Sequence, residues 1–280
     1  MKAAAASYDR ELESACVVAL QAAQLIMRHR AAGLIVDSKP GDEPVTDADH
    51  AANLMIVNHL RAEFPDDVIL SEEIPDDRSR LGRPRVWMVD PIDGTRDFIL
   101  GDNGFAVMIG LCVDGRPLVG VVAQPTTDKL YGAVVGQGAW LAVGGGERAP
   151  LHTSSLAQPP GIRLVASKSH RTPRVDAVKA ALRITDEINI GSVGLKIGLV
   201  AESSRDLYVY TGGRTKIWDT CGPEAILVAA GGRMSDLDGR PLSYDGEDLY
   251  NRRGIVASNG ALHDTVIATI APFVAKAKAD

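Results

Sequence analysis

Two amphipathic segments open the chain, and the spacing of their apolar positions predicts two helices. In the first, apolar side chains recur at helical intervals after Ser7, a residue suited to cap a helix N-terminus. The second is expected to begin at Thr46 or Asp47 and to run to about Phe64, because the turn-forming residues 65–67 follow. The apolar positions of the first helix are Leu12, Cys16, Leu20, Ala23 and Met27.

Short apolar runs then predict β-strands. Residues 68–71 and 86–89 are expected to be buried strands, and acidic residues follow each of them directly. From residue 105 to residue 143, apolar runs alternate with turn signals such as Asp114-Gly115. This pattern predicts an antiparallel meander with strands at 105–113, 118–123 and 129–135.

The second half alternates strand-like and helix-like segments, which favours an α/β arrangement. The Gly-, Ser- and Pro-rich stretch 144–161 is the candidate boundary, so we expect one α+β half over residues 1–150 and an α/β half over residues 151–280. The expected strands are 163–166, 207–210 and 254–258, and the expected helices are 175–182, 194–202, 223–230 and 262–278.

Composition narrows the possible partners. The 280 residues are 45% apolar and carry a net charge of -6 with no basic block, which excludes a nucleic-acid polymer as the expected partner. No run reaches the roughly 18 apolar residues of a membrane span, and the acidic start of the chain lacks the pattern of a cleaved leader. Three scattered cysteines fit neither a disulfide framework nor a Cys-rich metal site. We therefore expect a soluble cytoplasmic protein.

The segment around Asp90 carries the clearest chemistry. An apolar strand leads to Asp90, Pro91 prevents regular continuation, and Asp93 follows beside Gly94, which permits a tight turn. Paired carboxylates, with a backbone carbonyl freed at Ile92, suit Mg²⁺, which prefers oxygen ligands. A helix starting at residues 94–96 would direct unpaired amides toward a phosphate.

Each acidic segment also has a plain structural interpretation. Asp-Pro-Ile-Asp-Gly is a good turn sequence, Glu72 and Glu73 could be a solvated pair, and Asp219 could cap a helix starting near Pro223. The occurrence of all three segments in one chain favours a metal site.

The chain resembles the inositol monophosphatase superfamily of metal-dependent phosphatases. The resemblance rests on four motifs in family order, which are Thr46-Asp-Ala-Asp49, Ser71-Glu-Glu73, Asp90-Pro-Ile-Asp-Gly-Thr95 and Trp218-Asp219. It implies a five-layer αβαβα sandwich and two or three Mg²⁺ ions at one site. The implied metal ligands are Glu72, Asp90, Asp93, Asp219 and the Ile92 carbonyl. Thr95 and Asp49 would orient and deprotonate the attacking water.

Within the superfamily, the chain is more similar to the 3'(2'),5'-bisphosphate nucleotidases. The resemblance implies that His170, Ser192 and Lys196 contact the substrate, together with Gly94, Thr95 and Asp219. The segment 211–216 contains no acid of the kind that grips inositol hydroxyls, which favours a doubly phosphorylated substrate. His170 and Lys196 could instead be solvated surface residues. In the similar proteins an arginine usually follows the Asp-Leu-Tyr motif, but in this chain it is replaced near Tyr210. Arg214 or Lys216 could substitute for that arginine.

The expected activity is magnesium-dependent removal of the 3'-phosphate from 3'-phosphoadenosine 5'-phosphate, giving AMP and phosphate. An inositol or sugar monophosphatase is the alternative, and a metal-binding regulatory protein without catalysis is a remote one. The expected partner is a small phosphorylated substrate. The sequence leaves the oligomeric state open, a homodimer included.

Overall fold

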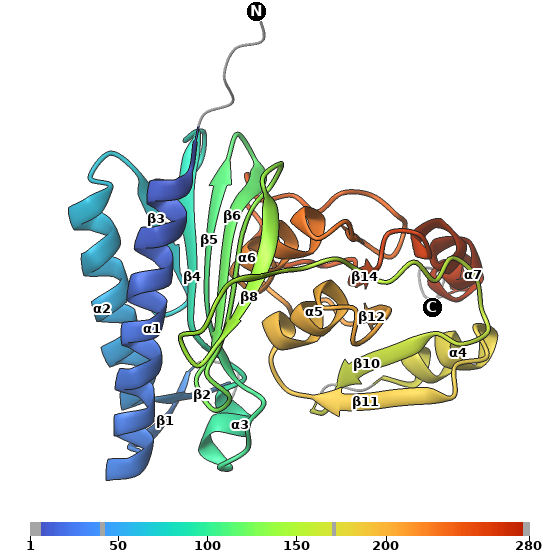
Figure 1. Cartoon of the computed structure of the whole chain (residues 1–280), viewed down its shortest axis with the longest axis horizontal. Coiled ribbons are helices and arrows are strands. Elements are labelled where there is room, and N and C mark those ends of the chain that lie inside the picture. Colours follow the sequence, from blue (N-terminus) through green and yellow to red (C-terminus); the bar gives the residue numbers. More distant parts are fainter. Residues whose placement is uncertain (1–6, 40–42, 170–171, 277–280) are drawn as a thin grey trace, which may run out of the picture.

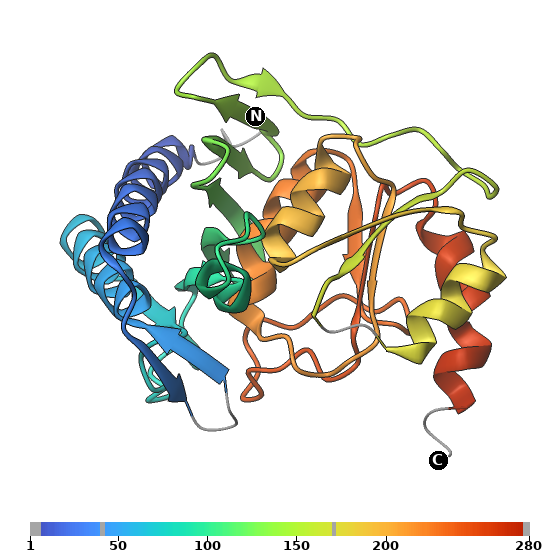
Figure 2. The same cartoon turned by 90° about the horizontal axis from the view of Figure 1, so that it is seen from below.

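A computed structural model of the chain describes residues 7–39, 43–169 and 172–276. In this part of the chain, helices and sheets alternate in five layers, which follow one another from left to right in Figure 1. The same order is visible from below in Figure 2. The expected αβαβα sandwich is therefore confirmed.

The first sheet is largely antiparallel. Neighbouring strands along the chain pair antiparallel throughout, except that the first two are parallel. The predicted meander is thus confirmed, and two further strands extend it. In spatial order the strands are β3 (Val68–Ser71), β4 (Arg85–Asp93), β5 (Ala106–Val113), β6 (Arg116–Gln124), β7 (Lys129–Val134), β8 (Gly138–Val143) and β9 (Ala149–Pro150).

The second sheet is mixed. Its central strand β12 pairs parallel with β10 and antiparallel with β14. The sequence analysis missed β11 and β13, because both lie at edges of the sheet and neither is a continuous apolar run. In spatial order the strands are β11 (Asp186–Ile190), β10 (Arg163–Ser167), β12 (Leu207–Tyr210), β14 (Ile255–Ser258) and β13 (Arg233–Ser235).

Helices α1 (Asp9–Ala32) and α2 (Asp47–Glu63) cover the outer face of the first sheet. The prediction that Ser7 caps α1 is wrong, because Tyr8 occupies the cap position and the Ser7 hydroxyl donates to Asp9 Oδ2 at 2.6 Å. Leu20 is 44% exposed, so the buried stripe of α1 runs through Ala19 and Ala23 instead. The short strands β1 (Val36–Lys39) and β2 (Glu43–Thr46), which were not predicted, pair antiparallel between the two helices.

Helices α5 (Val193–Ala201) and α6 (Ile217–Ala229) form the middle layer between the sheets. Glycines let α6 approach the first sheet closely, since Gly110 and Gly120 pair across β5 and β6 and both face Gly222 of α6. A Cβ atom at Gly120 would lie 2.1 Å from the Gly222 carbonyl oxygen. Because α6 carries Asp219, this contact also positions the site. The predicted boundary near residue 150 stays a prediction.

We expect Gly120→Ala to lower the free energy of unfolding by about 2 kcal/mol, because the added methyl group forces α6 away from the sheet. Urea unfolding of both proteins measures the change. Gly246→Ala is the matched control, since its Cβ would meet only the Ser243 hydroxyl at 3.3 Å. Equal stability of the Gly120 variant and the wild type would contradict this close packing.

Helices α4 (Pro173–Ala181) and α7 (His263–Lys276) cover the outer face of the second sheet, and the single-turn helix α3 (Thr95–Ile99) follows β4. Leu164, Val175 and Val266 belong to the apolar cluster under α4 and α7. No helix among the described residues combines the length and the apolar character needed to cross a membrane.

His263 at the start of α7 predicts an acid-dependent loss of stability. The ring is buried, with Nε2 2.8 Å from the Ser235 hydroxyl and Nδ1 3.0 Å from the Ser258 hydroxyl. Burial lowers the pKa of His263 to about 4, against about 6.5 when unfolded. Because the folded pKa is depressed, the stability is fully present above about pH 6.5 and is lost as the pH falls toward 4.

Between about pH 7.5 and pH 5, the wild type should lose about 2 kcal/mol of unfolding free energy through this residue. His263→Gln should lack that component, so the difference between the two proteins in urea unfolding should shrink with acid. Parallel pH profiles would show that the imidazole is not held neutral by the fold.

Candidate active site

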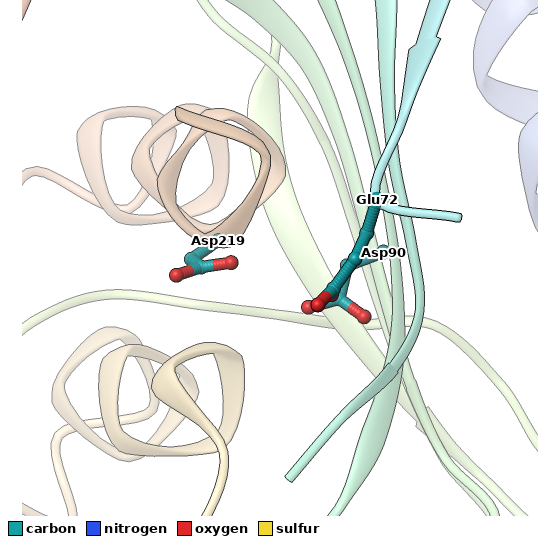
Figure 3. A group of neighbouring side chains, drawn as sticks. All are labelled: Glu72, Asp90 and Asp219. Atoms are coloured by element: carbon teal, nitrogen blue, oxygen red, sulfur yellow. The ribbon is translucent and has the colours of Figure 1, made fainter. Parts of the chain in front are cut away.

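Two parallel strands and one helix bring three carboxylates together. β3 and β4 are in register with Ser71 opposite Val89, so the next residues, Glu72 and Asp90, emerge side by side at one edge of the first sheet. The Glu72 amide donates to the Val89 carbonyl at 3.1 Å. Asp219 approaches from α6, across from the sheet (Figure 3). One oxygen from each of Glu72, Asp90 and Asp219 lies within 4.8 Å of the others. We call these residues the carboxylate trio.

Asp219 lies within α6 rather than before it. The expected helix start near Pro223 is wrong, because α6 begins at Ile217 and includes the proline. Asp219 Oδ2 accepts a hydrogen bond from the Lys216 amide at 2.8 Å, so the carboxylate caps the first turn of the helix. Asp219 therefore caps the helix and belongs to the site at the same time, whereas the sequence suggested these two roles as alternatives.

The Asp-Pro-Ile-Asp-Gly segment is an irregular end of β4. Asp90 pairs with Met108 and Asp93 with Ala106, so three steps along β4 match two along β5. Asp90 Oδ1 accepts from the Ile92 amide at 3.0 Å. Gly94 then adopts a φ of 96°, as its expected tight turn requires.

Asp93 is tied to the second half of the chain. Its Oδ2 accepts hydrogen bonds from the Ser192 hydroxyl at 2.6 Å and from the Gly194 amide at 3.0 Å, both at the start of α5. Ser192, which was expected to contact substrate, therefore has its hydroxyl directed at Asp93 in this structure. Asp93 lines the same cavity as the trio but is not one of its members.

Thr95 and Asp49 come together as expected. The Thr95 hydroxyl lies 3.4 Å from Asp49 Oδ1 and 3.0 Å from the Ile92 carbonyl oxygen. Asp49 Oδ2 accepts from the amide and the hydroxyl of Thr46, at 2.8 and 2.6 Å, in a capping box that starts α2. Burial raises the pKa of Asp49 to about 6.

The trio concentrates carboxylates at a site where Asp90 is buried and Glu72 and Asp219 are half-buried. Burial raises the pKa of Asp90 and of Asp219 well above the ordinary range, and repulsion from Glu72 and Asp93 raises both further. Such clustering is costly unless a cation balances it. An all-oxygen donor set of this kind suits a hard divalent cation.

Two lysines balance part of this charge. Lys39 Nζ lies 3.1 Å from Glu72 Oε1 and 2.5 Å from Glu73 Oε1, and Lys216 Nζ lies 3.8 Å from Glu72 Oε1. Sequence reasoning missed Lys39, because it stands outside every motif and β1 was not predicted.

A cavity of about 210 Å³ opens beside the trio and is lined from both halves of the chain. Gly94 and Thr95 line it from the first half, together with Glu72, Asp90 and Asp93. From the second half come Ser192, Lys196, Tyr208, Tyr210 and Arg214.

Lys196 is a cavity residue and not a solvated surface lysine, since it is only 2% exposed. Its ammonium donates to the Gly191 carbonyl and lies 5.3 Å from the centre of the Tyr208 ring. Burial lowers the pKa of Lys196 to about 8, although attraction from Asp93 opposes the shift. His170, the other predicted nucleotide contact, lies outside the described residues.

Comparisons of the sequence and of the structure with known proteins both find similar proteins. The sequence matches the inositol monophosphatase family over residues 8–274. It is 36% identical over 250 residues to the 3'(2'),5'-bisphosphate nucleotidase CysQ of Escherichia coli O157:H7, covering 88% of this chain and 99% of that protein. The histidinol-phosphatase of Mycobacterium tuberculosis (strain ATCC 25618 / H37Rv) is 33% identical over 247 residues, with coverages of 87% and 91%. The structure of CysQ from Bacteroides thetaiotaomicron superposes with a TM-score of 0.75 at 31% identity, covering 90% of this chain and 98% of that chain.

Proposed function

Since the chain belongs to the inositol monophosphatase family, we propose that it is a phosphatase that removes the 3'-phosphate from 3'-phosphoadenosine 5'-phosphate, giving AMP and inorganic phosphate. The observation that carries the proposal is that one cavity is lined by both acidic and basic side chains. The carboxylate trio lines it together with Lys196 of α5, a buried lysine on which the charges of Asp93 and Asp219 act. A substrate with a second phosphate would use both the acidic site and the lysine.

The segment before α6 supports the same substrate. Residues 211–216 contribute Arg214 and Lys216 to the cavity wall and contain no carboxylate. An acid here would repel a second phosphate, whereas basic side chains attract one. The similarity to the CysQ nucleotidases supports this choice of ester.

We propose that the trio and Asp93, with the Ile92 carbonyl, hold two or three Mg²⁺ ions. The close approach of the trio's carboxylates around the buried Asp90 supports this assignment. When bound, Mg²⁺ would supply positive charge that stabilises the phosphoryl and leaving-group oxygens.

The residues of the chain itself then activate water. The Thr95 hydroxyl carries one proton and can donate to only one acceptor at a time, so its lone pairs stay free to accept a hydrogen bond from a water molecule. Thr95 would take a proton from this water while it passes its own hydroxyl proton to Asp49. The pKa of Asp49, about 6, suits a general base near neutral pH. The Thr46 capping box holds Asp49 in place for this transfer.

The deciding experiment is a comparison of rates on 3'-phosphoadenosine 5'-phosphate, inositol 1-phosphate and histidinol phosphate, each with Mg²⁺ and with chelator. We expect magnesium-dependent phosphate release with the highest kcat/KM on the bisphosphate. A higher kcat/KM on either monophosphate would overturn the proposed substrate. Inactivity across the panel would favour a protein that binds metal without catalysis.

We further propose a cytoplasmic location, supported by Cys16, Cys112 and Cys221, which are all buried free thiols. Cell fractionation tests the location. A homodimer is the association state to examine first, by light scattering of the purified protein.

A further inference from the structure

We propose that Arg214 is a specificity-determining residue that binds the second phosphate of a doubly phosphorylated substrate. This inference rests on the proposed function and assigns a residue that none of the family motifs in this sequence contains.

Arg214 has charge available for a ligand. It is exposed and lines the cavity, and no ion pair involves it within the part of the chain that the structure describes. The other cations of this wall are already engaged. Lys216 lies 3.3 Å from Glu43 and 3.8 Å from Glu72, and the Lys196 ammonium donates to a main-chain carbonyl.

The loop that carries Arg214 is anchored on both sides. The main chain of Arg214 hydrogen-bonds to the Tyr210 hydroxyl, and a Cβ atom at Gly212 would lie only 2.4 Å from that hydroxyl oxygen. On the other side, the Thr215 carbonyl accepts from the Asn251 amide at 2.8 Å. An arginine on such a fixed loop loses little backbone freedom when it binds an anion.

The position of Arg214 matches a phosphate remote from the reacting one. Tyr208 and Tyr210 both line the cavity from β12 and lie two residues apart, a spacing of about 7 Å along a strand. The Lys196 ammonium lies beside the Tyr208 ring, and the Arg214 main chain bonds to the Tyr210 hydroxyl, so the two residues border neighbouring parts of one cavity wall. A phosphate between them would meet a buried ammonium and a planar guanidinium, which can donate two parallel hydrogen bonds.

Arg96, unlike Arg214, is placed to contact the phosphate that all substrates share. It also lines the cavity, but it directly follows Thr95, beside the reacting phosphate that every substrate shares. A charge there would affect monophosphates and bisphosphates alike. Arg214 should distinguish between them.

The test compares Arg214→Gln with the wild type on 3'-phosphoadenosine 5'-phosphate and on adenosine 3'-phosphate. We expect KM for the bisphosphate to rise about tenfold with little change in kcat, and the monophosphate kinetics to stay unchanged. Arg214→Lys should recover part of the loss, since it keeps the charge but not the paired donors.

Arg252→Gln is the matched control. Arg252 lies beside the same loop, with its carbonyl near Gly213, but it pairs with Asp248 at 2.9 Å and does not line the cavity. This variant loses the same charge and should keep wild-type kinetics on both substrates. Thermal unfolding of all variants confirms that they are folded.

A double-mutant cycle with Lys196→Met tests whether both cations meet one phosphate. We expect the loss in the double variant to differ from the product of the two single losses, on the bisphosphate only. Equal effects of Arg214→Gln on both substrates, or none on either, would overturn the assignment while the proposed function stands. A wild type that shows no preference for the bisphosphate over adenosine 3'-phosphate would overturn both.

Discussion

Replacement of Asp90 by Asn is expected to lower kcat about 10³-fold, a loss of about 4 kcal/mol in transition-state stabilisation. Asp90 is the buried member of the carboxylate trio, and its oxygen lies within 4.8 Å of ligand oxygens of Glu72 and Asp219. An amide there supplies a weaker, uncharged donor at the place where the cation would be held. Steady-state assays at saturating Mg²⁺ measure the loss.

The same substitution should leave the metal-free protein at least as stable as the wild type. Burial and the neighbouring acids raise the pKa of Asp90 well above its ordinary range, so its charged form is disfavoured in the fold. Urea unfolding in chelator measures this stability, and the rise in melting temperature on adding Mg²⁺ should be smaller in the variant. Wild-type turnover by Asp90→Asn would refute the metal assignment.

Asp206→Asn is the matched control for a buried carboxylate outside the site. Asp206 is buried but accepts hydrogen bonds from Arg163 and Ser154, and the Arg163 guanidinium helps to hold its pKa below the usual range. Its neutralisation should therefore reduce stability and leave kcat unchanged. Opposite effects of the two substitutions would separate a repulsive carboxylate cluster from an ordinary ion pair.

Replacement of Lys196 by Ala should weaken the bisphosphate substrate by about 1.5 to 3 kcal/mol more than a monophosphate, the scale of a charge-assisted hydrogen bond. Most of the difference should appear in KM, because the contact is remote from the reacting phosphorus. A smaller loss shared by all substrates is also expected, since the Lys196 charge favours ionised Asp93.

Because Lys196 is buried, truncation to alanine also removes packing and leaves the Gly191 carbonyl without its donor. Lys196→Met is the second variant, since it keeps most of the side-chain volume and removes only the charge. The kinetic measurement uses 3'-phosphoadenosine 5'-phosphate beside adenosine 3'-phosphate. Losses of equal size on both would show that Lys196 supports the site without meeting the second phosphate.

Much of the local structure could be predicted from the sequence. The helices α1 and α2, the meander and the strands that lead to Glu72 and Asp90 follow from apolar periodicity and turn residues, which act within a few positions. The carboxylates stood out because three acidic segments occur in one chain, two of them directly after apolar strands, which favours a metal site over three separate structural roles. The ends of elements were less well predicted, as the start of α6 shows.

The tertiary structure alone decided how these residues combine. The parallel register of β3 and β4 sets Glu72 beside Asp90, whereas the Gly120 and Gly222 contact brings Asp219 to them from far along the chain. The tertiary structure also turns the Ser192 hydroxyl toward Asp93 and buries Lys196. It places Lys39 beside Glu72. Burial and long-range pairing depend on which surfaces meet after folding. A sequence pattern therefore identified the reactive groups, whereas only the packed layers set their distances and charge states.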